Sequence, residues 1–252
     1  MYKIYNVKPM RTIRFLAIVT IVALCVSCEQ QGKVNTLTKK EKADGWVLLF
    51  DGKTTNGWHN WNQDTLSGWI VEDSSLVGLG LGGDIGGDII SNDEYENFDL
   101  KWDWKLGPHG NSGVMYHVVE DTMYHAAYET GPEYQLIEDD DFWDENGEHY
   151  PLEEWQKTAC DYAMYLPDSL LKHVNVRGWN SSEIIFTPEK VEYWLNGNKM
   201  LEFVPWSEDW YERRNSGKWD AYPDYGLAKK GKLCLQDHGS RIWFRNIKIK
   251  PL

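Results

Sequence analysis

The chain has 252 residues, with 39 acidic against 26 basic side chains and a formal net charge of −13 at pH 7. This length allows one large domain or two small ones. The acidic balance excludes nucleic acid as a partner, because phosphates need clustered Lys and Arg side chains, and it argues against an anionic membrane surface. A neutral ligand is the favoured partner.

The first 27 residues are predicted to be an export signal. Lys3, Lys8, Arg11 and Arg14 supply positive charge, and a nearly unbroken apolar run follows over residues 15–26. A helix that spans a bilayer needs about 20 apolar residues, so this run is too short to span. Its length is typical of the apolar core of a signal peptide.

The apolar run ends at Val26-Ser27-Cys28, which resembles the lipobox of a bacterial lipoprotein. We therefore predict that Cys28 is lipidated after cleavage and that residues 28–44 form a polar tether. The protein would then be exported and lipid-anchored in the cell envelope, in the periplasm or at the outer membrane. The alternative is an ordinary secreted protein whose cleavage site lies beside a cysteine.

Residues 45–252 are predicted to form one domain, because no linker, composition break or internal repeat interrupts them. Phe98–Leu106 alternates apolar and charged residues as a strand does, and Asn196-Gly197 is a strong hairpin turn signal. This pattern predicts an all-β jelly roll, a β-sandwich of two antiparallel sheets. Strands are expected at Trp46–Phe50, Trp69–Val77 (as a hairpin), Phe98–Leu106, Asn111–His117, Gly131–Ile137, His173–Trp179, Glu183–Thr187, Val191–Leu195, Lys199–Val204, Lys232–Gln236 and Arg241–Lys250.

The strand at Gly131–Ile137 carries the first candidate site. Side chains alternate between the two faces of a strand, so Glu133 and Gln135 share one face while Tyr134 and Leu136 share the other. A carboxylate and an amide on one face, backed by an apolar face, suit a sandwich with one functional surface.

Tryptophans and acidic residues supply further candidates. Trp102, Trp104 and Trp243 are expected in the core, since they follow the strand alternation. Indoles in the irregular segments Asp139–Pro167 and Pro205–Lys230 could stack on a sugar ring. The indoles of these segments are Trp143, Trp155, Trp206, Trp210 and Trp219.

The acidic residues between Glu138 and Glu148 are dense enough for a hard cation, although a solvated loop is the favoured interpretation. Near the C-terminus, Gln236 and His238 share a strand face, and His suits proton transfer near neutral pH. Cys160 and Cys234 are expected to be buried small apolar side chains, and a disulfide between them stays open. No spacing resembles a zinc site.

Six fragments in order resemble the 3-keto-disaccharide hydrolase domain family, a concanavalin-like jelly roll common in Bacteroidetes lipoproteins. The resemblance covers about residues 45–252. Its carriers are Trp46–Thr54 with Gly57-Trp58, Phe98–Leu100 leading to Asn111–Gly113, Gly131–Gln135, Tyr193–Gly197, Leu235–Gly239 and Phe244–Ile247.

The resemblance implies cleavage of glycosides that are already oxidised to a ketone at C3 of the sugar. It implies that Glu133, Asp139 and His238 transfer protons and that Asn111, Gln135 and Gln236 orient the substrate. Three further residues are candidates for substrate binding: His117, which stands where relatives are expected to carry Arg, and the indoles of Trp143 and Trp206. A divalent cation could stabilise the enolate, so the cofactor stays open.

Two other functions stay open beside this one. The same sandwich could be a carbohydrate-binding lipoprotein without catalysis, since a fold does not fix a function. It could also be a glycosidase that uses two carboxylates, such as Glu133 with Glu138 or Asp139.

Overall fold

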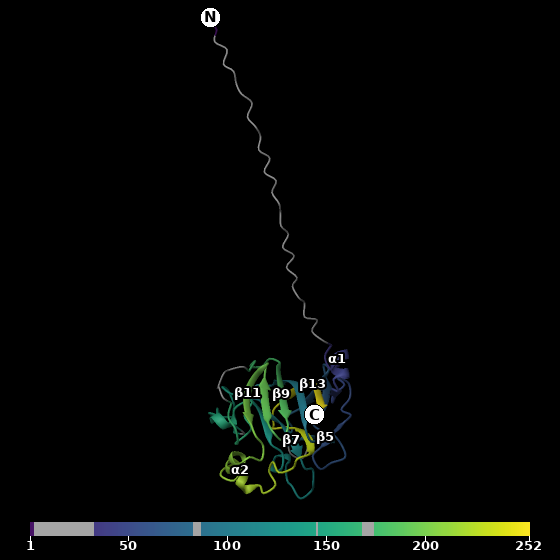
Figure 1. Cartoon of the computed structure of the whole chain (residues 1–252), viewed down its shortest axis with the longest axis vertical. Coiled ribbons are helices and arrows are strands. Elements are labelled where there is room, and N and C mark those ends of the chain that lie inside the picture. Colours follow the sequence, from purple (N-terminus) through teal and green to yellow (C-terminus); the bar gives the residue numbers. More distant parts are fainter. Residues whose placement is uncertain (3–32, 83–86, 145, 168–173) are drawn as a thin grey trace. The chain divides into compact units, whose positions relative to one another are not determined.

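Two antiparallel β-sheets pack face to face, and their strands carry most of the regular structure (Figure 1). The structure is a computed structural model that describes residues 1–2, 33–82, 87–144, 146–167 and 174–252. The predicted jelly-roll sandwich is confirmed. The predicted apolar run of the export signal and Cys28 lie outside the described residues.

Sheet A is the larger of the two. Its strands are β1 (Val47–Leu48), β3 (Trp69–Glu72), β4 (Ser75–Gly78), β6 (Phe98–Leu106), β9 (Asn180–Phe186), β10 (Val191–Leu195), β11 (Asn198–Phe203) and β13 (Ile242–Pro251). They lie side by side in the order β11–β10–β9–β6–β13–β4–β3, and β1 also pairs with β13.

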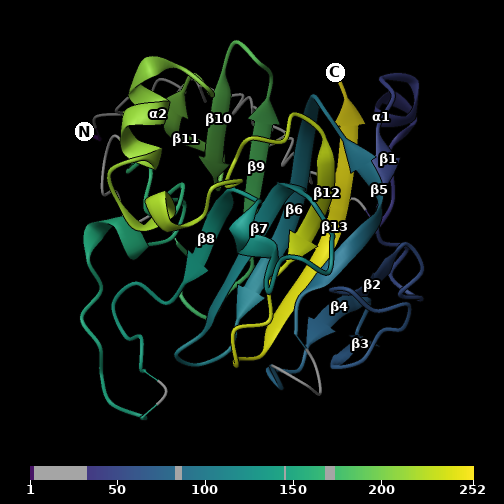
Figure 2. The same ribbon diagram turned by 90° about the horizontal axis from the view of Figure 1, so that it is seen from below.

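Sheet B lies over sheet A (Figure 2). Its strands are β2 (Trp58–Asn60), β5 (Ile89–Tyr95), β7 (Asn111–Val118), β8 (Glu133–Ile137) and β12 (Gly231–Leu235), in the order β2–β5–β12–β7–β8. The helical segments are short: α1 (Lys39–Ala43), α2 (Glu208–Arg214) and the 3-10 helices η1 (Ala127–Glu129), η2 (Glu154–Gln156) and η3 (Lys218–Ala221).

The core lies between the sheets and is rich in aromatic rings. Strand β6 alternates buried and partly buried residues along its whole length, as its sequence predicts. Its Trp102 meets Tyr134 of β8 edge to face at 5.1 Å. The Tyr134 hydroxyl donates to the Trp194 carbonyl at 3.1 Å and accepts from Ser182 at 3.0 Å. Burying each such ring contributes about 1.5–3 kcal/mol, and the two hydrogen bonds satisfy the hydroxyl of Tyr134.

The structure corrects several of the predicted elements. Residues 174–179 form no strand, whereas β2 and β5 were not predicted. Trp243 lies opposite Lys105 on the outer face of sheet A, with the Lys105 ammonium 4.3 Å from its ring, so it is not a core residue. Conversely, Trp210 and Trp219 are buried, because the segment over residues 205–230 folds into α2 and η3 and has apolar contacts of its own.

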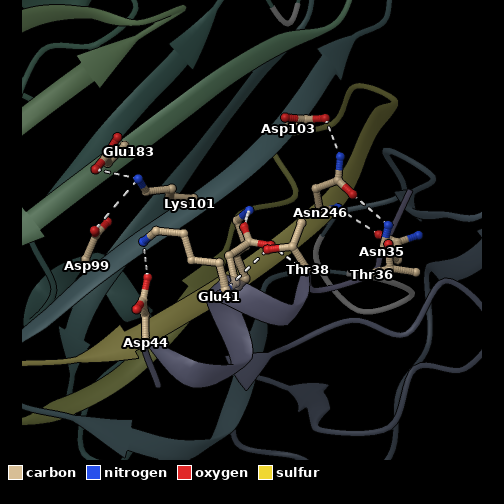
Figure 3. Close-up of polar contacts among 12 residues, drawn as sticks. Asn35, Thr36, Thr38, Glu41, Asp44, Asp99, Lys101, Asp103, Glu183 and Asn246 are labelled. Atoms are coloured by element: carbon tan, nitrogen blue, oxygen red, sulfur yellow. Dashed lines mark hydrogen bonds and ion pairs between the residues drawn. The ribbon is translucent and has the colours of Figure 1, made fainter. Parts of the chain in front are cut away.

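Residues 33–44 dock on the outer face of sheet A (Figure 3). The backbone N–H of Asn35 donates to the Asn246 side chain at 2.6 Å, and the Asn246 N–H returns a bond of 2.7 Å to Asn35. Helix α1 begins with a capping box, in which the Thr38 and Glu41 side chains each accept a hydrogen bond from the other residue's backbone N–H. Glu41 also forms an ion pair with Lys248. These contacts attach residues 33–44 of the predicted polar tether to sheet A.

Cys160 and Cys234 are buried free thiols, as the favoured interpretation expected. Among the described residues, no helix is both long and apolar enough to cross a bilayer.

Candidate active site

The candidate site lies on the face of sheet B that points away from sheet A. Tyr134 and Leu136 pack into the core between the sheets, so Glu133 and Gln135 lie on the outer face of β8, as the alternation predicts. All five residues of β8 are nevertheless buried. The outer face is therefore covered in this region rather than open to solvent.

Backbone pairing brings further polar side chains to the same place. Gln135 lies opposite Gly113 of β7, and the backbone N–H of Gln236 donates to the Gly113 carbonyl at 3.0 Å. The Gln135 amide donates weakly to the Asn111 side chain at 3.4 Å. We call this cluster the Glu133 site, and it comprises Asn111, Gly113, Glu133, Gln135 and Gln236.

Gly113 makes room for the Glu133 carboxylate. A Cβ atom at position 113 would lie 2.0 Å from Glu133 Oε1 and 2.8 Å from its Cγ and Cδ atoms. No side chain other than hydrogen fits there while Glu133 keeps its place. The carboxylate thus lies over the backbone of β7, the strand between β8, which carries Gln135, and β12, which ends just before Gln236.

Two amide oxygens of the Glu133 site have no hydrogen-bond partner among the described residues. Gln135 is 3% and Gln236 is 8% exposed, yet Oε1 of each is buried and unbonded. Burying a polar group without a partner costs about 1–3 kcal/mol, so native proteins rarely leave one unexplained. Two such oxygens beside one carboxylate are typical of a site whose missing partners belong to a ligand, such as the hydroxyl groups of a sugar.

Charged residues on other segments act on Glu133. Burial raises the pKa of its carboxyl, the charge of Lys218 at the start of η3 opposes that shift, and the charge of Asp88 before β5 adds to it. Burial also raises the pKa of Asp88 to about 7, although the Asp237 N–H that donates to it opposes the shift. Both carboxyls can therefore hold a proton near neutral pH. Burial raises the pKa values of Asp161, Tyr162, Tyr225 and Cys234, and the charge of Glu133 raises them further.

Asp88 and Lys218 are the residues that the sequence analysis missed. Asp88 immediately precedes the apolar pair Ile89-Ile90, so that recognising β5 would have placed it beside β12. Lys218 carries no local signal, because a 3-10 helix distant in sequence brings it to Glu133.

His238 lies beyond the end of β12, two residues after Gln236, and is exposed. Ser240, two residues further along, accepts a hydrogen bond from the Asn111 N–H at 2.7 Å and donates one to the Asn111 carbonyl at 2.9 Å. These bonds hold the His238 loop at the Asn111 end of the Glu133 site. Among the described residues, none forms a hydrogen bond with the His238 ring.

The structure does not place His117 in the site. His117 is 2% exposed, its ring packs on Phe186 with centroids 4.4 Å apart, and its Nε2 lies 2.8 Å from the Glu96 carbonyl. Its backbone φ of 53° breaks the strand alternation and turns the side chain away from the outer face. Burial lowers its pKa to about 4, as expected for a neutral structural histidine.

The two predicted substrate-stacking indoles also lie elsewhere. Trp206 packs against Phe186 of the core and donates to the Gly226 carbonyl at 2.8 Å. Trp143 is exposed, but it stacks on His109 at 4.5 Å. Neither contacts a residue of the Glu133 site among the described residues.

Asp139 lines a different cavity. This cavity, of about 170 Å³, is bordered by Trp104 and Leu106 of β6 and by loop residues that include Arg177. Asp139 accepts a hydrogen bond from the Thr158 N–H at 2.8 Å. The structure therefore separates Asp139 from Glu133, because the chain leaves β8 at Ile137 before Asp139 is reached.

The acidic loop does bring one potential metal-binding group together. Ligand atoms of His109, Glu138 and Asp141 lie within 4.8 Å of one another. Arg177 faces both carboxylates at 3.6 Å, so an arginine already balances their charge.

A family model described as the 3-keto-alpha-glucoside-1,2-lyase-like domain matches residues 45–250. The chain belongs to this family. The match includes every residue of the Glu133 site and confirms the resemblance inferred from the motifs. A relative from Bacteroides thetaiotaomicron, named 3-keto-disaccharide hydrolase, is 30% identical over an alignment of 244 residues that covers 87% of this chain and 83% of the relative.

Two crystal structures of proteins from Parabacteroides distasonis, both described as glycosyl hydrolases, extend the comparison. The first is 52% identical with a TM-score of 0.80, and the match covers 87% of this chain and all of the other. The second is 28% identical with a TM-score of 0.61, and the match covers 82% of this chain and 99% of the other. The 3-keto-alpha-glucoside-1,2-lyase-like domain therefore accounts for nearly all of the described chain.

Proposed function

We propose that this protein hydrolyses glycosides whose sugar carries a ketone at C3, by proton abstraction at C2. The observation that carries the proposal is the Glu133 site. In the part of the chain that the structure describes, its buried carboxylate has no ion-pair partner, and two amide oxygens of the same site are unbonded. The family description and the name of the 30% identical relative support this substrate class.

The ketone makes the chemistry accessible to a single carboxylate. It acidifies the C2 proton, so that a base can remove it and leave an enolate across C2, C3 and the C3 oxygen. The enolate then collapses: the C3 carbonyl and a C1–C2 double bond form, the bond from C1 to the aglycone oxygen breaks, and that oxygen takes a proton. Water adds at C1 and a proton returns to C2, so the net reaction is hydrolysis.

Glu133 is the base in this scheme. Its raised pKa makes the ionised carboxylate a stronger base than an exposed one, and catalysis is most efficient when the pKa lies near the working pH. Gln135 and Gln236 accept hydrogen bonds from sugar hydroxyls, and Asn111 holds the Gln135 amide in place. Asp88, with its pKa of about 7, is the carboxyl that can protonate the leaving oxygen.

Matched substrates test this proposal. We expect turnover of 3-keto-α-glucosides and none of the unoxidised parents, with solvent deuterium at C2 of the product in D₂O. Glu133→Gln should lower kcat/KM by about 10²–10⁴-fold while leaving the circular dichroism spectrum unchanged. The matched control is Glu148→Gln, which alters an exposed loop carboxylate and should retain wild-type activity.

Other outcomes would reject the proposal in distinct ways. Equal turnover of the unoxidised glycoside, or product without deuterium at C2, would indicate direct displacement by a two-carboxylate glycosidase. Binding of either sugar without any turnover would indicate a carbohydrate-binding protein.

A further inference from the structure

Lys218 holds its charge over three aromatic rings beside the Glu133 site. Its ammonium lies 4.4 Å from the centroid of the Tyr162 ring, 4.6 Å from Trp219 and 5.6 Å from Tyr128. The rings belong to three separate segments. Cation–π contacts of this kind fix a flexible ammonium group in position.

The same rings connect Lys218 to the strand that carries Glu133. The backbone N–H of Tyr162 donates to the Glu133 carbonyl at 3.0 Å, and the indole N–H of Trp219 donates to the Tyr162 carbonyl at 2.9 Å. Lys218 precedes Trp219 directly. Two consecutive hydrogen bonds thus tie its position to β8.

Lys218 has free donors although the protein is strongly acidic. Glu133 is the carboxylate whose charge acts on Lys218, and it does so through space without a hydrogen bond. Among the described residues, none forms an ion pair with Lys218. The residue is exposed, so its N–H donors are accessible from solvent.

A lysine over aromatic rings is often only a surface contact worth about 0.5–1 kcal/mol. Two observations argue for more here. Lys218 is the cation whose charge acts on the carboxylate proposed as the base, and the proposed reaction needs a positive group near that base. When Glu133 removes the C2 proton, the electron pair of the broken C–H bond moves to the C3 oxygen, which becomes negative.

We propose that Lys218 donates a hydrogen bond to the C3 oxygen and stabilises the enolate. This role rests on the proposed function. The proton from C2 goes to Glu133, the negative charge forms on the C3 oxygen, and Lys218 stays protonated and covalently unchanged throughout. A fixed donor aimed at a developing oxyanion contributes about 10²–10³-fold to kcat.

Deuterium exchange isolates this step from the loss of the aglycone. Methyl 3-keto-α-glucoside in D₂O loses its C2 proton signal in NMR spectra when the enolate forms, whether or not methanol leaves. We expect Lys218→Met to slow both exchange and turnover by about 10²–10³-fold, mainly through kcat. Lys218→Arg keeps the charge and should lose less than about tenfold.

The control is Lys229→Met, since Lys229 also lies over an indole, 5.2 Å from the ring of Trp206, but outside the Glu133 site. It should behave as the wild type. A second readout is the pH profile, because removing the Lys218 charge raises the pKa of Glu133 and moves the rise of activity to higher pH. A purely structural lysine would not cause that shift.

Three results would overturn parts of this scheme separately. Wild-type exchange in Lys218→Met, with an active wild type, would reject the role of Lys218 and leave the proposed function standing. A borohydride-trapped adduct on Lys218 would show an imine intermediate instead of a hydrogen bond. Absence of exchange and turnover in the wild type would reject the proposed function itself.

Discussion

Substituting Gly113 by alanine should displace the Glu133 carboxylate without unfolding the protein. The new Cβ would lie 2.0 Å from Glu133 Oε1, where an ordinary contact begins at 3.4 Å. The oxygen must therefore retreat by roughly 1.4 Å to a normal van der Waals distance. Gly113 has no positive φ, so alanine is compatible with the strand, and overpacking should cost about 1–3 kcal/mol of unfolding free energy.

A displacement of about 1 Å at a catalytic group can lower the rate by 10²-fold, so Gly113→Ala should lower kcat/KM on a 3-keto glucoside by about that factor. Urea denaturation of the same variant measures the stability cost. The double variant Gly113→Ala/Glu133→Gln is the control, because alanine should add little once the carboxylate is gone. Independent, multiplicative losses in the double variant, or wild-type activity in Gly113→Ala, would refute the reasoning.

Three further predictions concern the rest of the chain. Burial holds the pKa of Asp161 well above its ordinary value, so the folded protein keeps a proton that the unfolded chain releases above about pH 4. The free energy of unfolding therefore falls as pH rises from 5 to 8, by at most about 1.4 kcal/mol per pH unit for this group. In Asp161→Asn the urea midpoint should fall less over this pH range than in the wild type. An equal fall in the two proteins would contradict this. Asn246→Ala removes hydrogen bonds to Asn35 and Asp103 and should lower the free energy of unfolding, measured by urea denaturation, by about 1–3 kcal/mol. An unchanged urea midpoint would show that the contact of residues 33–44 with Asn246 does not stabilise the protein. We propose that Cys28 is lipidated, so Cys28→Ala should move the protein from the membrane fraction to the soluble fraction. Retention of the variant in the membrane fraction would reject lipidation at Cys28.

The sequence predicts those parts of the fold that depend on local pattern. Strand β6 has the predicted bounds, because alternation of apolar and charged residues over nine positions is a strong signal. Strand β5 was missed since only its first residues are apolar, and its second half, Asn92–Tyr95, is polar and largely exposed.

In the candidate site, too, the sequence predicts the residues that depend on local pattern and misses those that depend on tertiary packing. Glu133 and Gln135 were predicted to share a face because regular alternation requires it, and the structure agrees. His117 fails since one positive φ, which the sequence does not announce, reverses the side-chain direction. Lys218 and Asp88 depend on tertiary packing of distant segments, and no pattern within either segment reports that packing.

Strand β8 is the last strand of sheet B, and an unpaired edge strand normally offers its backbone to other chains. Here residues 159–162 occupy that edge: the Gln135 N–H donates to the Cys160 carbonyl, and the Ala159 and Tyr162 N–H groups donate to the Gln135 and Glu133 carbonyls. With β7 bonded on the other side, the strand cannot slip by one residue, a shift that would exchange its two faces. The covered edge therefore protects the protein from edge-to-edge aggregation and preserves the register on which Glu133 and Gln135 depend.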